Sequence, residues 1–169
     1  VVAAGGGQTV ADVIAAAEEM LADGKAEDAA QVFAALLEED RENLEAIGGL
    51  VRAYVALGRI EEAKAALELV HPAKTIDPAV TRAKAALEMA EQAQGASGEL
   101  AGLKAKVEAD PADLEGRLEY AKALMAAGDN AEAIDQLLEL FRRDREWREG
   151  VAKEQLTKLF ESLGPKDPP

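Results

Sequence analysis

The chain has no cysteine among its 169 residues. This absence excludes a disulfide framework, a thiolate zinc site and thiol chemistry within the sequence. His71 is the only histidine, so the histidine pairs and Cys–His arrangements of metal sites and of nucleophilic catalysis are excluded as well. No glycine fingerprint stands between a strand and a helix. We therefore expect no catalytic residues, no metal and no cofactor, and we do not expect an enzyme.

Positive charge is also scarce. The 33 acidic residues outnumber 19 basic ones, which gives a formal net charge of -14, and no basic stripe is present that could neutralise phosphates. Nucleic acid and anionic membranes are therefore not expected as partners. The longest apolar stretch, near residues 29–37, is too short to cross a bilayer. The acidity is typical of a solvated surface, and it also favours basic or apolar partners.

Aromatic residues make up only 4% of the chain, whereas apolar residues make up 49%, and much of that share is alanine. Small side chains allow helices to approach closely, so this composition suits layered helix pairs better than a sandwich or a barrel. We expect an all-α fold.

A short motif recurs along the chain with a fixed spacing. It reads Gly24-Lys25-Ala26-Glu27-Asp28-Ala29, then Gly58-Arg59-Ile60-Glu61-Glu62-Ala63, then Gly128-Asp129-Asn130-Ala131-Glu132-Ala133. The first two glycines are 34 residues apart, and the third follows after two such periods and a two-residue insertion. This is the spacing of tetratricopeptide repeats, in which helix-turn-helix units stack on one another. It predicts a right-handed superhelical array of such units.

The repeat register places small residues at the positions where the two helices of a unit should meet. With each glycine at position 15, position 8 holds Ala17, Val51 and Ala121, and position 20 holds Ala29, Ala63 and Ala133. Larger groups fall at position 24 (Phe33, Leu67, Leu137) and at position 11 (Met20, Tyr54, Leu124). Small residues thus face small residues, and large ones fill the space between layers.

These patterns predict a domain organisation. Residues 1–9 contain a glycine run typical of a flexible linker, which we interpret as leading from a missing upstream domain. Repeats are expected at 10–43, 44–77, 78–113 and 114–147, followed by a capping helix at 148–164 and a disordered tail at 165–169. The unit at 78–113 is degenerate, with a helix ending near Gln94, a loop at 95–98 and a second helix from Glu99 to about Ala109. In the capping segment, Val151, Leu156, Leu159, Phe160 and Leu163 form one apolar stripe.

The candidate binding surface is the inner face formed by the first helix of each unit. Its apolar members include Leu21, Val55 and Met125, which recur at position 12, and the full candidate set is Ile14, Leu21, Arg52, Val55, Leu118, Lys122 and Met125. Arg52 and Lys122 are isolated cations, so they make a poor clamp for an acidic C-terminal tail. The apolar residues have two interpretations, ordinary packing between repeats or a shallow groove for extended or partly unfolded hydrophobic segments.

The C-terminal part resembles a more specific family. The residues that carry the resemblance are Asp110-Pro111-Ala112-Asp113-Leu114, Leu118 to Met125, Ala133 through Trp147, and Leu159-Phe160-Glu161-Ser162-Leu163-Gly164. They resemble the C-terminal tetratricopeptide half of bacterial thioredoxin-like co-chaperones, the chaperedoxins. The chain departs from that family in lacking the thioredoxin-like domain and the basic and apolar stretch after the final Leu-Gly.

The resemblance implies a cytoplasmic, non-catalytic module that holds unfolded or partly folded client proteins and contacts partner proteins, including a chaperonin. Without cysteine the chain cannot protect client thiols on its own. The alternative is a tetratricopeptide scaffold that recognises one defined peptide or protein. The two hypotheses separate on selectivity, since a holding protein suppresses aggregation of unrelated clients whereas a scaffold binds one sequence.

Overall fold

The structure is a computed structural model that describes residues 7–164, and every regular element in this range is helical. The all-α prediction is confirmed. Most of the predicted linker and all of the predicted tail lie outside the described residues. No helix in the described range is both long enough and apolar enough to cross a membrane. The chain divides into two compact units, Val1–Ala93 and Gln94–Pro169, and we describe each by itself.

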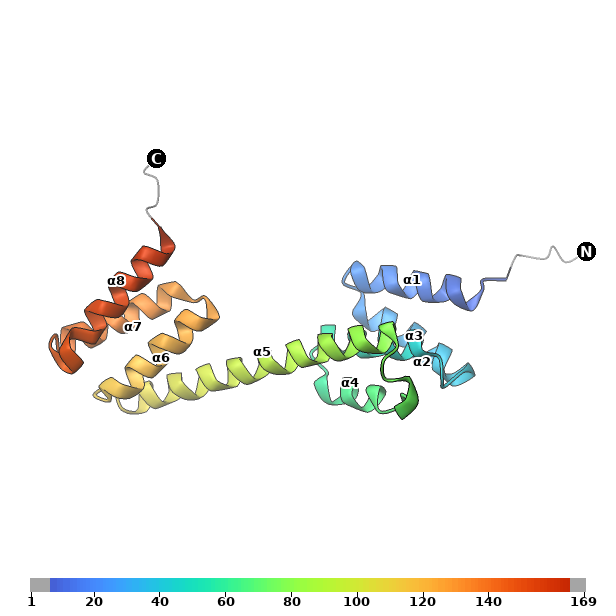
Figure 1. Cartoon of the computed structure of the whole chain (residues 1–169), viewed down its shortest axis with the longest axis horizontal. Coiled ribbons are helices and arrows are strands. Elements are labelled where there is room, and N and C mark those ends of the chain that lie inside the picture. The colour runs from blue at the N-terminus through green and yellow to red at the C-terminus, as the bar shows by residue number, and fades with distance from the viewer. Residues whose placement is uncertain (1–6, 165–169) are drawn as a thin grey trace, which may run out of the picture. The chain divides into compact units, whose positions relative to one another are not determined.

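The first unit, hereafter unit 1, contains two helical hairpins and the start of a long helix. Its elements are α1 (Val10–Ala22), α2 (Ala26–Glu39), α3 (Leu44–Ala56), α4 (Ile60–Leu67), the 3-10 turn η1 (Pro72–Lys74) and the first part of α5 (Pro78–Ala109). Within this unit α2 packs against both α1 and α3, and α3 packs against α4 (Figure 1). Its core combines residues from all of these helices, including Phe33, Ile47 and Val80, each 0% exposed.

The second unit, unit 2, follows the same plan. It contains the last part of α5, then α6 (Leu114–Ala127), α7 (Asn130–Arg143), the 3-10 turn η2 (Trp147–Gly150) and α8 (Val151–Leu163). Within it α6 packs against α7, and α7 packs against α8 (Figure 1). Leu137 and Leu140 of α7 are 0% exposed and form the centre of one apolar cluster.

The repeated glycines end the first helix of each hairpin. Gly24 has φ +79° and Gly128 has φ +81°, a left-handed conformation that other residues rarely adopt. In each case the next residue's backbone N–H donates to a carbonyl five residues back, at 2.8 Å from Lys25 to Met20 and at 2.9 Å from Asp129 to Leu124. This is the bonding pattern of a Schellman cap, so the motif spacing reflects a recurring helix end.

The predicted close-contact positions are among the most buried of the described residues. Ala17, Val51, Ala121, Ala29, Ala63 and Ala133 are all 0% exposed. A side chain larger than these would keep the two helices of a hairpin apart. The burial therefore confirms the residue register, while the boundaries of the four units remain a prediction.

The predicted loop at 95–98 is wrong, because α5 continues through these residues as helix. Gly95 and Gly98 each disfavour a helix by about 1 kcal/mol relative to alanine, a cost that the surrounding alanine, glutamate and glutamine residues tolerate. Residues 92–99 are all exposed, so no tertiary contact opposes the helix there. Val80, Ala83 and Leu87 belong to the core of unit 1, and Val107 belongs to a core cluster of unit 2.

The predicted apolar stripe of the capping segment needs a partial correction. Leu156 and Leu159 are buried as expected, together with Ala152. Phe160 and Leu163 are 54% and 49% exposed, so they are not part of the buried face. Phe160 follows Leu159 by one position, which rotates its side chain by about 100° around the helix, away from the buried Leu159.

Candidate functional site

Two of the predicted binding residues, Ile14 and Arg52, meet at a cleft in unit 1. The cleft has a volume of about 270 Å³ and lies where α1, α3 and α5 come together. Its lining residues are Ile14, Glu18, Glu45, Arg52, Ala79 and Arg82. The lining is mainly charged, so this part of the inner face is less apolar than the sequence suggested.

Arg52 is held by Glu18 across the cleft. Its guanidinium donates two hydrogen bonds to the Glu18 carboxylate, one from Nη1 to Oε2 at 2.9 Å and one from Nη2 to Oε1. Both side chains are partly buried, with 21% and 36% exposed. Arg52 Nε is buried and has no hydrogen-bond partner among the described residues. The cation is therefore engaged within the protein and is not free to bind a partner's carboxylate.

Sequence reasoning identified Arg52 but missed Glu18. The two residues are 34 positions apart, so they occupy the same place in consecutive repeats. Opposite charges one repeat period apart on the inner face were the available signal, since equivalent positions of stacked repeats lie side by side.

Leu21 and Val55 lie on the last turns of α1 and α3. Both are partly exposed and pack against the core of unit 1, as Ile14 does. Each side chain therefore contributes to the core with one edge and faces solvent with the other. These half-buried edges are the apolar surface that the unit 1 candidates offer.

The unit 2 candidates have three different environments. Leu118 is 2% exposed within the core, so its side chain packs against neighbouring helices, the first of the two interpretations given above for the apolar residues. Met125 is partly exposed and packs against two core clusters. Lys122 is exposed. The charge of Lys122 acts on one neighbour, Glu154. The pKa of Glu154 is lowered mainly by the hydrogen bond and charge of Lys158, and the charge of Lys122 lowers this pKa further.

Within residues 7–164, no three histidine, aspartate or glutamate side chains gather as metal ligands would. The groups that the structure brings together at the cleft are an ion pair, further charges of both signs and the aliphatic side chains of Ile14 and Ala79. Such an arrangement can bind a polypeptide by packing and hydrogen bonding.

Comparison with known protein families supports this interpretation. Two family models, both described as tetratricopeptide repeat, match the chain, one at residues 20–87 and the other at residues 93–169. A search of curated proteins found no match. Between them the two models leave only residues 1–19 and 88–92 unmatched.

Proposed function

Because this chain carries tetratricopeptide repeats and is thus a protein-interaction module, we propose that it holds exposed apolar segments of unfolded or partly folded client proteins. In this proposal it is the client-holding and partner-docking half of a thioredoxin-like co-chaperone, a cytoplasmic protein whose partners include a chaperonin. The observation that carries the proposal is the engagement of Arg52 by Glu18.

That ion pair argues against recognition of acidic tails. A carboxylate clamp needs cations whose donors point into the groove and have no internal partner. In unit 1 the Arg52 guanidinium already donates to both oxygens of Glu18, and Glu45 adds a further negative charge to the cleft lining. A partner's carboxylate would have to displace Glu18 to reach Arg52, and the opposite charges of Glu45 and Arg82 in the same lining offset each other.

The half-buried aliphatic side chains favour an apolar ligand. Ile14, Leu21 and Val55 each expose part of their surface on the first helices of the two unit 1 hairpins. Removing apolar surface from water is worth about 25 cal/mol per Å² and needs no particular partner sequence. Broad, weak selectivity of this kind is what holding unrelated clients requires.

The second candidate is a scaffold for one defined peptide. The small cleft favours it, because the fixed Glu18–Arg52 pair and the neighbouring Arg82 present charges in set positions. A ligand with matching charges would be selected over others.

Aggregation assays on two unrelated heat-labile clients distinguish these functions. A client-holding protein suppresses light scattering by both clients, and the effect persists from low to near-molar salt because apolar contacts are weakly screened. A scaffold protects neither client, or only one that contains its peptide. Suppression that disappears in high salt would contradict the apolar mechanism.

The apolar surface is tested with Val55→Asp against the matched control Ala56→Asp. Val55 is partly buried and Ala56, the next residue of α3, is exposed, so both variants add the same charge to the same helix end. We expect loss of suppression only for Val55→Asp, with helix content verified by circular dichroism. If Val55→Asp proves unstable, Val55→Thr takes its place, because threonine keeps the shape of valine and adds only a hydroxyl. We expect Val55→Thr to show an intermediate loss of suppression. Full activity in a folded Val55→Thr variant would refute a role for this surface.

A further inference from the structure

Two grooves occupy the same place in the two helical hairpins of unit 1. The first, of about 360 Å³, lies between the start of α1 and the end of α2, and the second, of about 200 Å³, lies between the start of α3 and the residues that follow α4. We call them the hairpin-end grooves. Three pairs of their lining residues are one repeat period apart in sequence, namely Val10 and Leu44, Ala35 and Leu69, and Leu36 and Val70.

Each hairpin-end groove contains a large apolar side chain that is about half exposed. Val10 in the first groove is 49% exposed, and Leu69 in the second is 53% exposed. Leu36 and Val70 are buried at equivalent positions, so a partner would meet an apolar surface that is anchored in the core of unit 1. No residue lines both a hairpin-end groove and the cleft where α1, α3 and α5 come together. The two grooves are therefore a separate surface from the candidate site described above.

The charges that line the hairpin-end grooves are mainly negative. Glu39 lines the first groove, and Glu42 and Glu68 line the second, where Lys74 is the single lysine or arginine among the lining residues and lies 3.7 Å from Glu42. Glu39 and Glu68 form no ion pair with another residue in the range 7–164. His71 Nδ1 accepts a hydrogen bond from the backbone N–H two residues later at 3.2 Å, so its ring adds no positive charge here. One carboxylate in each groove is thus available to a cationic partner.

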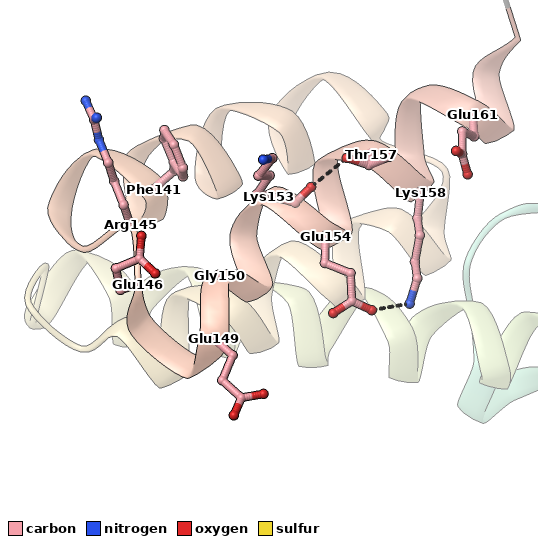
Figure 2. Close-up of a pocket in the computed structure, with 10 residues that line it drawn as sticks. All are labelled: Phe141, Arg145, Glu146, Glu149, Gly150, Lys153, Glu154, Thr157, Lys158 and Glu161. Carbon is pink, nitrogen blue, oxygen red and sulfur yellow. Dashed lines mark hydrogen bonds and ion pairs between the residues drawn. The ribbon is translucent and has the colours of Figure 1, made fainter.

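A larger groove on unit 2 does not combine these features. It lies between the end of α7 and α8, has a volume of about 800 Å³ and is shown in Figure 2. Four carboxylates and three cations line it, and Glu154 pairs with Lys158 at 2.6 Å. Its one aromatic ring, Phe141, is covered by the Arg145 guanidinium at 5.3 Å from the ring centre. Charges of both signs give this groove no preference for a partner of one charge, in contrast to the hairpin-end grooves.

The spacing of the hairpin-end grooves favours a helical partner. Their α1 and α3 sides belong to helices that pack against each other, and the axes of packed helices are about 8 to 10 Å apart. A partner helix lying across both grooves advances about 10.5 Å in seven residues, so its residues i and i+7 would reach one groove each. An extended segment would leave its backbone N–H and C=O groups against aliphatic side chains, whereas a helix bonds these groups internally.

We propose that the hairpin-end grooves bind a basic amphipathic helix of a partner protein. Two apolar residues of this helix, seven positions apart, cover Val10 and Leu69, and lysine or arginine residues beside them pair with Glu39 and Glu68. Apolar contact supplies the driving force, and charge complementarity selects helices of this sign. The grooves share no residue with the inner-face candidates, so this site is independent of the client-holding function.

Fluorescence anisotropy with a labelled, cross-linked helical peptide tests the site at about 0.1 M salt. The lysine probe carries leucines at positions i, i+3 and i+7 and lysines on both sides of this stripe. One control peptide has glutamate in place of every lysine, and another has the same composition with the leucines distributed around the helix. We expect the full chain to bind the lysine probe about tenfold more tightly than either control. Equal affinity for the three peptides, or no saturable binding of the lysine probe at millimolar protein, would overturn the proposal.

Substitutions in the full chain show whether the grooves are responsible. Leu69→Ser should weaken binding of the lysine probe about tenfold. The variant E39K/E68K should weaken binding of the lysine probe and strengthen binding of the glutamate peptide, because it reverses both available carboxylates. The control E19K/E88K makes the same charge change at exposed positions outside both grooves and should bind like the parent. Equal weakening by the two double variants would attribute binding to net charge alone and would contradict a groove site.

Two further measurements separate this site from other binding modes. Val55→Thr, on the inner face, should bind the lysine probe like the parent, and this result is expected whether or not the chain holds clients. NMR spectra recorded with the probe should show shift changes around Val10, Ala35 and Leu69, and changes confined to unit 2 would rule out the grooves. Sedimentation of the parent chain alone should give a monomer. Self-association that E39K/E68K abolishes would assign the grooves to a second copy of the chain and would overturn the proposal.

Discussion

A pair of glycine-to-alanine substitutions tests the packing of α3 and the continuity of α5 together. Gly49 lies inside α3, and a Cβ atom built there would be 2.3 Å from Cζ of Phe33. Gly95 lies inside α5, and a Cβ atom there would meet nothing within 4 Å. Both substitutions exchange the poorest helix former other than proline for the best, a gain of about 1 kcal/mol in a helix interior.

The two sites differ in the steric term. The ring of Phe33 is 0% exposed, so it cannot yield to the new methyl group without moving its neighbours. Overpacking of this kind costs about 1 to 3 kcal/mol, which equals or exceeds the propensity gain. We expect G49A to range from neutral to about 2 kcal/mol destabilising, and G95A to be stabilising by about 0.5 to 1 kcal/mol. The propensity terms cancel in the comparison, so the difference between the variants measures the clash.

Guanidinium unfolding followed by circular dichroism gives the two free energies. Hydrogen exchange of peptides from α2 and α3 then locates the effect of G49A within unit 1. Equal stabilisation by both substitutions would show that Phe33 does not pack against Gly49. Absence of any gain from G95A would refute a continuous helix at that position.

Two further predictions concern unit 2. Ala133→Leu, at a position that is 0% exposed, should destabilise the protein by about 1 to 3 kcal/mol in the same unfolding assay, whereas Ala131→Leu at an exposed site of the same helix should have little effect. Lys158→Met should raise the pKa of Glu154, because the Lys158 hydrogen bond is the main cause of its lowering. A lowered carboxyl pKa stabilises the fold above the unfolded-state pKa, and this contribution is lost as pH falls through the folded value. NMR titration that gives the same Glu154 pKa in both proteins would contradict the assignment.

Much of the helical packing could be predicted because it depends on local, repeated signals. The left-handed glycines recur at the same place in each motif, and the small residues at positions 8 and 20 recur with them. Each feature depends on the residue type at a single position of the repeat. The 34-residue spacing of the motif therefore identifies both features in the sequence. The packing of Leu118 could not be told from a binding role in the sequence, because an apolar residue on the inner face has the same appearance whether a neighbouring helix covers it or not.

The burial of the Arg117 side chain could not be predicted from the sequence, for a related reason. Arg117 is only 6% exposed, and its guanidinium donates to Gln136 Oε1 at 2.5 Å and to the Pro111 carbonyl at 3.4 Å. Burial lowers the pKa of Arg117. Its partners are a side-chain amide and a backbone carbonyl, so no opposite charge at a regular spacing marks the contact in the sequence. It links the turn before α6 to α7, a role that only the folded arrangement defines.

The turns between hairpins show how one residue changes where the next helix begins. The Asp40, Asp110 and Asp144 carboxylates each accept a hydrogen bond from the backbone N–H two residues later, at 3.0, 3.1 and 3.0 Å. After the first two turns, Asn43 and Asp113 cap the next helix by accepting from a backbone N–H three residues on. These two positions have the short polar side chains that such caps require.

The third turn has Trp147 at the capping position, and an indole cannot accept that hydrogen bond. The backbone instead passes through left-handed conformations at Arg148 (φ 50°), Glu149 (φ 58°) and Gly150, and α8 begins without a side-chain cap. Each of the two non-glycine residues costs about 1 to 2 kcal/mol in this conformation. Packing of Trp147 against the core of unit 2 and the 2.7 Å ion pair of Arg148 with Glu115 oppose that cost. As a result α8 begins at Val151, seven residues after Asp144, whereas α3 and α6 begin at Leu44 and Leu114, four residues after Asp40 and Asp110.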